Sequence, residues 1–170
     1  MQFESENRIL VLGNSGSGKT FLSGSLVNYL DLKIISLDDV CWEPGGYYKR
    51  RSDEDVKSDL KRISLSSNWV IEGVYGDIAE TLFPRLTHLY WLDLDSVFCA
   101  DSVSKRGFEN IPWMDTEEKI QGYLNHIRSY HKNSGPMSRE FHEYIFNSYS
   151  GNKMIFKSRE DVNEFMKNLK

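Results

Sequence analysis

A glycine-rich octapeptide near the amino terminus limits the folds open to this chain more than any other feature. Residues 13–20 read GNSGSGKT and match the pattern G-x-x-x-x-G-K-[ST] in full. Residues 8–12, RILVL, are apolar and β-branched and predict a buried strand. Residues 21–30 carry leucines at i, i+4 and i+8 and predict a helix. A strand, this loop and a helix in succession predict a phosphate-binding loop.

The residue types of the loop suit the triphosphate of a nucleotide. Glycines let the backbone approach phosphate oxygens closely, and the helix that follows adds a positive dipole. Lys19 is expected to reach the β- and γ-phosphates, and the Thr20 hydroxyl to ligate Mg²⁺. The pattern thus predicts ATP and Mg²⁺ as cofactors, bound by Gly13, Asn14, Ser15, Gly16, Ser17, Gly18, Lys19 and Thr20. Phe21 breaks the alternative pattern G-x-G-x-x-G, which argues against a dinucleotide fold.

The rest of the chain alternates short apolar segments with helical patterns. Strands are predicted at residues 33–37, 69–71, 88–92 and 154–156, and further helices at about 53–65 and 158–169. This alternation predicts an α/β fold with a parallel sheet covered on both faces. A length of 170 residues fits a single domain, residues 1–170. Ligands of such sheets bind at the carboxyl ends of the strands.

Carboxylates follow three of the predicted strands. Asp38, with Asp39 beside it, follows the second strand and is expected to take a proton from an acceptor hydroxyl or to orient it. Glu72 follows the third strand and is the preferred partner of Thr20 in a magnesium site. Asp93 follows the fourth strand and competes with Glu72 for that role.

Basic side chains must neutralise the oxygens of the transferred phosphoryl group. The candidates are Lys105, Arg106, Arg128 and Arg139. Arg106 is favoured among them because an irregular stretch follows it, and residues 104–116 are expected to form a small lid that closes over the phosphates.

Aromatic residues gather near the predicted strand ends. Trp42, Tyr47, Tyr48 and Tyr75 either line an acceptor pocket or pack under the turn at Gly45 and Gly46. The four histidines lack the spacing of zinc ligands and are expected to be ordinary surface or helix residues.

Composition limits the kinds of binding partner and the cellular compartment that we expect for this protein. The net charge is −4, and proteins that bind nucleic-acid phosphates usually carry a basic balance, so nucleic acid is not expected as a partner. No stretch is long and apolar enough for a membrane span, and no secretory segment is seen. Two distant cysteines cannot form a disulfide framework, so we expect a cytoplasmic protein.

These segments together resemble a known group of enzymes. GNSGSGKT, SLDDVCWEPG, WVIEGVY, YWLDL and IFKSREDVNEFM are similar in order and spacing to the adenylate-kinase-like P-loop kinases, and most similar to the bacterial group often labelled "DNA topology modulation protein". The resemblance implies a three-layer P-loop NTPase fold with a five-stranded parallel sheet in the order 2-3-1-4-5. It also implies that Asp38 and Glu72 match the group's acids after strands two and three, the second of which is usually Asp. Related nucleotide kinases carry several arginines in the lid, whereas the corresponding region of this chain, KRGFENIPWMD, has few.

The residues and the resemblance predict an ATP-dependent phosphotransferase. Lys19, Asp38 and Arg106 are its candidate catalytic residues, Thr20 and Glu72 its metal ligands, and a small molecule its phosphoryl acceptor. Asp38, Asp39, Trp42 and Tyr75 are the candidate acceptor-binding residues. The alternative is a nucleotide-binding regulatory or partner-docking protein with little or no transfer activity.

Overall fold

The structure is a computed structural model that describes residues 6–44, 49–108, 111 and 114–169. Its five strands are β1 (Arg8–Gly13), β2 (Ile34–Ser36), β3 (Trp69–Gly73), β4 (His88–Leu92) and β5 (Asn152–Phe156). The α-helices are α1 (Lys19–Leu30), α2 (Leu37–Cys41), α3 (Asp53–Ser64), α4 (Gly76–Ala79), α5 (Ser96–Arg106), α6 (Glu117–Arg128), α7 (Arg139–Ser148) and α8 (Arg159–Lys167). A 3₁₀ turn, η1 (Glu80–Leu82), follows α4. Within the described ranges, none of the helices is long and apolar enough to cross a membrane.

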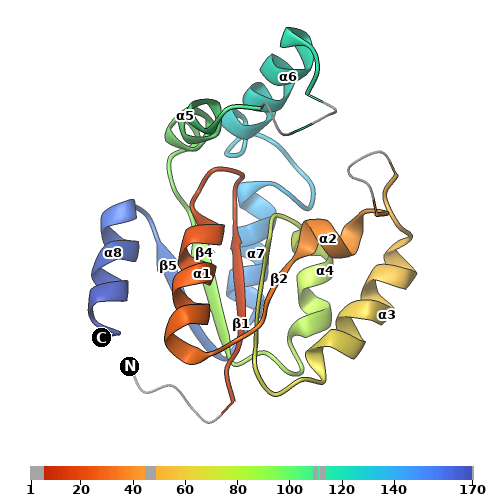
Figure 1. The fold of residues 1–170 in the computed structure, drawn as a ribbon, viewed down its shortest axis with the longest axis vertical. Helices are drawn as coiled ribbons and strands as arrows, with labels where there is room; N and C mark the ends of the chain where they lie inside the picture. The colour runs from red at the N-terminus through yellow and green to blue at the C-terminus, as the bar shows by residue number, and fades with distance from the viewer. Residues whose placement is uncertain (1–5, 45–48, 109–110, 112–113, 170) are drawn as a thin grey trace.

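The strands form one parallel sheet in the order β2-β3-β1-β4-β5, which confirms the predicted fold class and strand order. β1 lies in the middle, between β3 and β4 (Figure 1). Its residues Ile9 to Leu12 are almost completely buried, as expected of a central parallel strand that is covered on both faces. The phosphate-binding motif therefore begins at the carboxyl end of the central strand.

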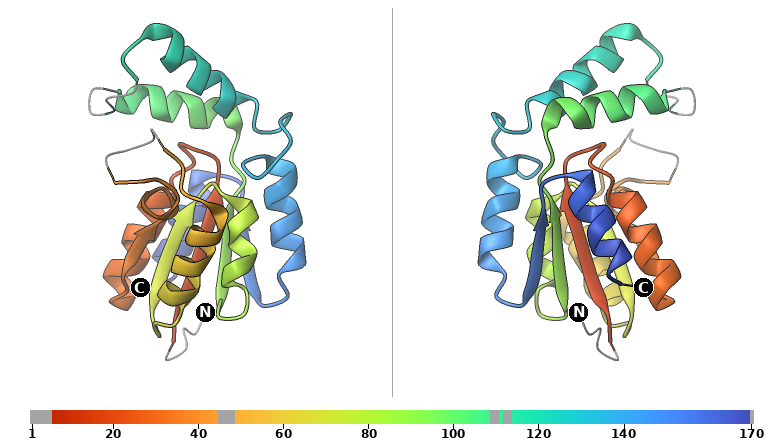
Figure 2. Two further views of the ribbon diagram at one scale, coloured as in Figure 1. Left: turned by 90° about the vertical axis from the view of Figure 1, so that its right-hand side faces the viewer. Right: turned by 90° about the vertical axis from the view of Figure 1, so that its left-hand side faces the viewer.

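Alternate residues of β1 enter two separate cores. Ile9 and Val11 pack in a cluster with α1, α5 and α8, whereas Leu10 and Leu12 pack in a cluster with α2, α3 and α7. The helices thus cover both faces of the sheet (Figure 2). This three-layer arrangement follows from the two-residue period of a strand, which sends successive side chains to opposite faces.

Two local predictions differ from the structure. α1 begins at Lys19 rather than Phe21, so the last residues of the motif are already helical. Leu37, predicted as the end of a strand, instead begins α2, and Asp38 lies on this helix rather than at a strand tip. The reason is a helix cap, because the Ser36 hydroxyl accepts a hydrogen bond from the Asp38 amide at 3.3 Å.

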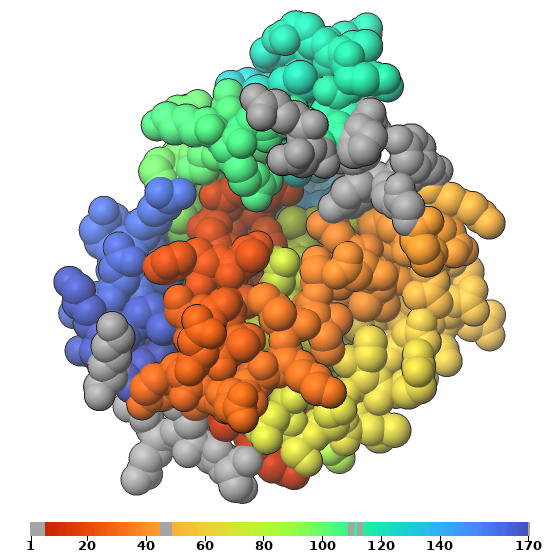
Figure 3. Space-filling view, in the orientation of Figure 1, coloured from red at the N-terminus to blue at the C-terminus, as the bar shows by residue number. Residues whose placement is uncertain are grey.

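Helices α5 and α6 lie beyond the carboxyl ends of the strands, at the opposite end of the molecule from the start of β1 (Figures 1 and 2). In the space-filling view, the green surface of α5 lies directly above the red and orange surface of the amino-terminal segment (Figure 3). The predicted lid spans the end of α5, and residues 109, 110, 112 and 113 of it lie outside the described residues. The helix pair therefore overlies the edge of the sheet where ligands of this fold bind.

Candidate active site

The loop between β1 and α1 has the backbone geometry that its glycines permit. Gly16 has φ +79°, a left-handed conformation that other residues rarely adopt. A Cβ on Gly16 would lie 2.2 Å from the carbonyl oxygen of Cys99 in α5. A Cβ on Gly13 would lie 2.7 Å from the carbonyl oxygen of Leu92, at the end of β4. The glycines therefore allow the loop to pack closely against its neighbours while it curves toward α1.

Lys19, the first residue of α1, is buried beside the loop. Its Nζ donates to the carbonyl oxygen of Asn14 at 2.8 Å, and the Asn14 amide in turn donates to the carbonyl oxygen of Ile127 at 2.9 Å. Burial lowers the pKa of Lys19, while the charges of Glu72 and Asp38 act in the opposite direction. The ammonium group thus lies between the loop and two carboxylates from other elements.

The two carboxylates reach this position from neighbouring segments of the sheet. Glu72 is the next-to-last residue of β3 and is buried, with 9% of its surface exposed. Burial raises the pKa of Glu72, the charge of Lys19 lowers it and the charge of Asp38 raises it. Asp38 reaches the same place from α2, which follows β2. Because β2 and β3 are neighbours in the sheet, they bring both acids close to Lys19.

Tyr75 and Trp42 join Asp38 in one hydrogen-bonded row. The Tyr75 hydroxyl donates to Asp38 Oδ1 at 2.8 Å, and Trp42 Nε1 donates to the Tyr75 hydroxyl at 2.8 Å. Tyr47 and Tyr48, the other two aromatic candidates, lie outside the described residues. The aromatic pair that is described thus adjoins the predicted proton acceptor.

All these groups open into one cleft of about 720 Å³. Its lining from the loop is Asn14, Ser15, Gly16, Gly18, Lys19 and Thr20. The other predicted site residues that line the cleft are Asp38, Trp42, Glu72, Tyr75 and Arg106. Asp39 is exposed and is not among the described residues that line the cleft, and neither are the basic candidates Lys105, Arg128 and Arg139.

Asp93, the competing metal-ligand candidate, has a different partner. Both of its carboxylate oxygens accept hydrogen bonds from the Arg139 guanidinium, the shortest at 2.8 Å. The guanidinium also lies over the ring of Trp91, 5.4 Å from its centroid. Asp93 therefore ties α7 to the end of β4, and of the two competing metal-ligand candidates only Glu72 is among the described residues that line the cleft.

Several lining residues were not predicted from the sequence. They are Val74, Ser102, Val103, Ile111, Tyr123, His126, Met137 and Arg159. Arg159, the first residue of α8, reaches across to α5, where it donates to the Ser102 hydroxyl at 3.3 Å and lies over the ring of Phe98. No local pattern marks these residues, because they come from separate segments and meet only in the folded chain.

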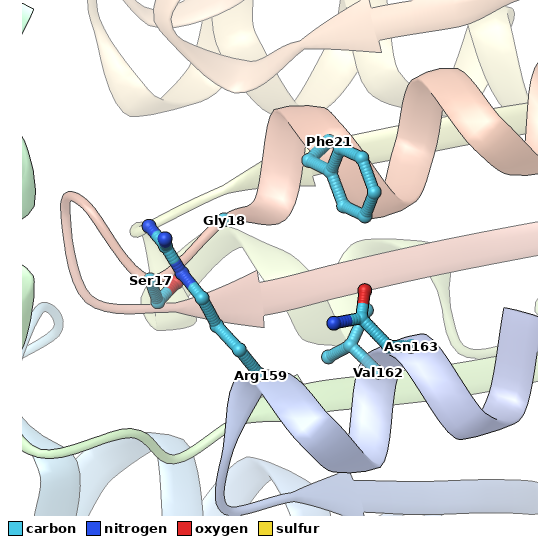
Figure 4. Close-up of a pocket in the computed structure, with 6 residues that line it drawn as sticks. All are labelled: Ser17, Gly18, Phe21, Arg159, Val162 and Asn163. Carbon is cyan, nitrogen blue, oxygen red and sulfur yellow. The ribbon is translucent and has the colours of Figure 1, made fainter.

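A second cavity of about 300 Å³ adjoins the loop between α1 and α8. Figure 4 shows Arg159 extending from α8 toward Ser17 and Gly18, while Phe21 on α1 faces Val162 and Asn163. The Ser17 hydroxyl is buried and makes no hydrogen bond within the described part of the chain. Since Arg159 and Gly18 also line the larger cleft, the two spaces meet at the start of α1.

Two histidines predicted as ordinary surface or helix residues are buried, His88 in β4 and His142 in α7. His142 Nε2 donates to the carbonyl oxygen of Val74 at 2.8 Å, so its Nδ1 accepts from the Tyr130 hydroxyl at 2.7 Å. Burial lowers the pKa of His142 to about 4. The histidine is therefore a neutral structural link between α7 and the residue before Tyr75.

The residues beside the loop fit a magnesium ion that takes some of its ligands from the protein and others from phosphate groups. Thr20 offers a hydroxyl and Glu72 a carboxylate, and both line the cleft. Among the described residues, no group of three or more His, Cys, Asp and Glu side chains could hold a metal ion alone. This donor set suits Mg²⁺, which usually takes one or two protein oxygens together with substrate phosphates and water.

Comparison with known proteins identifies the fold. No protein-family model matches the chain. The shikimate kinase of Acinetobacter baumannii, solved with shikimate, has a TM-score of 0.62 at 13% identity over 98% of this chain and 92% of that one. The shikimate kinase of Bacteroides thetaiotaomicron has a TM-score of 0.61 at 17% identity over 97% of each chain.

A third similar structure is a Bacillus subtilis protein, YorR, in complex with phosphorylated GDP. Its TM-score is 0.57 at 14% identity, over 95% of this chain and 92% of that one. At such identities the likeness concerns the fold. The chain has the three-layer fold of the P-loop kinases, with its glycine-rich loop, its acids and its cleft at the carboxyl edge of the sheet.

Proposed function

We propose that this protein is an ATP-dependent phosphotransferase that moves the γ-phosphoryl group of ATP to a hydroxyl of a small molecule. The observation that carries the proposal is the convergence of Lys19, Glu72 and Asp38 in one cleft beside the glycine-rich loop. The proposal includes the closer kinship with the adenylate-kinase-like group called "DNA topology modulation protein". The likeness to two shikimate kinases supports the general class of reaction.

The donor half of the site is the loop and the cavity beside it. The triphosphate of ATP is proposed to lie along residues 13–20, where main-chain N–H groups and the start of α1 favour an anion. The nucleoside then extends into the cavity between α1 and α8, where the Phe21 ring offers an apolar face and Arg159 a cation. The Ser17 hydroxyl, which makes no hydrogen bond within the described residues, belongs to a residue that lines the same cavity and is available to this ligand.

Thr20 and Glu72 are the residues that would hold Mg²⁺ beside the phosphates. The bound ion would neutralise part of the charge on the phosphate oxygens. Glu72 reaches this role from the buried end of β3, where its raised pKa reflects the absence of solvent around it. A nearby cation would favour its charged form, since an opposite charge lowers the pKa of a carboxylate.

The acceptor half is the part of the cleft lined by Asp38, Trp42 and Tyr75, and the unpredicted residues His126 and Met137 line the same cleft. The acceptor hydroxyl oxygen attacks the γ-phosphorus, its proton passes to Asp38, and the bond from that phosphorus to the β–γ bridging oxygen breaks. ADP leaves with the electron pair of that bond. Lys19 and Arg106 stabilise the charge on the phosphoryl oxygens during this transfer.

A direct test is the release of ADP from ATP and Mg²⁺ with a panel of nucleosides, nucleoside monophosphates, sugars and small hydroxy acids. We expect one acceptor class to raise turnover well above the basal rate, and Lys19→Ala to abolish the increase. ATP binding with no response to any acceptor would instead favour the nucleotide-binding regulatory protein. Retained transfer in Lys19→Ala would contradict the assignment of the loop.

A further inference from the structure

The row formed by Trp42, Tyr75 and Asp38 has a fixed direction. An indole N–H can only donate a hydrogen bond, and a carboxylate can only accept one. The Tyr75 hydroxyl accepts from Trp42 and donates its single proton to Asp38, both at 2.8 Å. The direction of each hydrogen bond therefore fixes the direction of the next, and the row ends on the Asp38 carboxylate, which lines the cleft.

The tyrosine in the middle of this row is held firmly by its main chain. The carbonyl oxygen of Val74, on one side of it, accepts a hydrogen bond from His142 at 2.8 Å. The N–H of Gly76, on the other side, donates to the carbonyl oxygen of Pro136 at 2.9 Å. A Cβ on Gly76 would lie 2.6 Å from the Phe141 ring, so only glycine allows this approach of α7.

The side chain of Tyr75 is also enclosed. The residue is 4% exposed, and the Arg50 guanidinium lies over its ring at 5.4 Å from the centroid. Asp77 holds that guanidinium with an ion pair of 3.3 Å. Burial, reinforced by the charge of Asp38, raises the pKa of Tyr75 far above its ordinary value, so the hydroxyl keeps the proton that it donates.

We propose that Trp42 and Tyr75 are positioning residues that orient the Asp38 carboxylate before the acceptor binds. This inference rests on the proposed function and deepens it, because it gives the aromatic pair a part in the reaction besides lining the cleft. A carboxylate that is already oriented costs less conformational entropy when the acceptor hydroxyl arrives. The hydrogen bonds from His142 to Val74 and from Gly76 to Pro136 hold the main chain on both sides of Tyr75, as a positioning role requires.

The kinetic test compares Tyr75→Phe and Trp42→Phe with the wild type. Tyr75→Phe keeps the ring and removes the bond to Asp38, so we expect kcat to fall roughly 10- to 100-fold with an unchanged KM for ATP. Trp42→Phe acts one step further away and should lower kcat less. Tyr149→Phe is the matched control, because it removes another buried tyrosine bond, to the carbonyl oxygen of Leu86, away from the cleft. It should leave kcat unchanged.

A spectroscopic test needs no acceptor. The chain has four tryptophans, whose indole N–H groups give separate resonances in a ¹⁵N–¹H correlation spectrum. Both Tyr75→Phe and Asp38→Asn should move the Trp42 resonance upfield, because a charged end strengthens every bond of the row. The Trp91 resonance is the internal reference, since its indole donates to Tyr130 instead.

The possible failures are distinguishable. A wild-type protein without acceptor-dependent turnover would refute the proposed function itself. Wild-type turnover with an unchanged kcat in Tyr75→Phe would overturn the positioning role alone. A Trp42 resonance that stays in place in both variants would overturn the hydrogen-bonded row, whatever the kinetics show.

Discussion

Asp38 and Asp39 are neighbours in α2, but only Asp38 lines the cleft. Asp38→Asn removes the proton acceptor and keeps the shape of the side chain. We expect ATP to bind normally and kcat to fall roughly 10²- to 10⁴-fold, the usual contribution of a general base. Asp39→Asn is the matched comparison and should transfer at nearly the wild-type rate. Equal turnover in wild type and Asp38→Asn, measured as ADP release, would remove Asp38 from the mechanism.

His142 makes stability depend on pH. Its pKa falls from 6.5 to about 4 on folding, so between these values the unfolded chain binds a proton that the folded chain does not. Stability should therefore fall as pH drops from about 6.5 to about 4, by about 3 kcal/mol in all at about 1.4 kcal/mol per pKa unit.

The variant His142→Gln isolates this effect. Its amide can still donate to Val74 and accept from Tyr130, but it does not titrate in this range. Urea unfolding at several pH values should show a shallower decline for the variant than for the wild type. Parallel curves for the two proteins would mean that another group causes the pH dependence.

At the scale of elements, the ion pair between Asp93 and Arg139 links α7 to the end of β4. Asp93 has only 4% of its side chain exposed and Arg139 has 27%. Arg139→Ala leaves a buried carboxylate without its partner, which should lower the free energy of unfolding by about 2 kcal/mol. Adding Asp93→Ala should recover part of that loss, so a double-mutant cycle from urea unfolding should give a clearly non-additive result. Additive losses would show that the pair does not couple α7 to β4.

The sequence predicted the elements whose signal is local. Short apolar segments located the strands, and the motif together with the resemblance gave the order of the sheet, which the structure confirms. Helices α6 and α7 went unassigned because each buries few side chains, Leu124 and Ile127 in one and His142 and Ile145 in the other. α2 was missed because an Asp pair typically marks a turn, whereas here the Ser36 cap and the helix dipole favour helix.

The residues of the candidate site also fall into those that the sequence predicts and those that it does not. The loop, Asp38 and Glu72 could be predicted because each follows an apolar segment that is typical of a buried strand, although Glu72 proves to lie within β3 and Asp38 on α2. Arg159 and His126 were not, because the sequence holds no sign that α8 and α6 approach the loop. Asp93 also looked like a metal ligand until the fold supplied Arg139 as its partner. Contacts between distant segments decide such roles, and they exist only in the folded chain.

At the scale of the whole molecule, α5 and α6 lie beyond the carboxyl ends of the strands (Figures 1 and 2), whereas α3 supplies none of the described residues that line the cleft. Arg106 from α5 and Tyr123 from α6 both line the cleft. Ligand in the cleft would therefore contact both parts and restrain their opening. Hydrogen–deuterium exchange should slow in α5, α6 and the loop when ATP and Mg²⁺ are added, with α3 unchanged as the control. Unchanged exchange in α5 and α6 would contradict the expectation that bound ligand restrains these two helices.

The central claim is that the γ-phosphoryl group of ATP reaches an acceptor. The most direct measurement is to incubate the protein with Mg²⁺, ATP labelled at the γ-phosphate and the acceptor panel, and to identify the labelled product. The account predicts label on an organic hydroxyl with the wild type and none with Lys19→Ala. Label that remains in ATP, or appears only in inorganic phosphate although ATP binds, would contradict it.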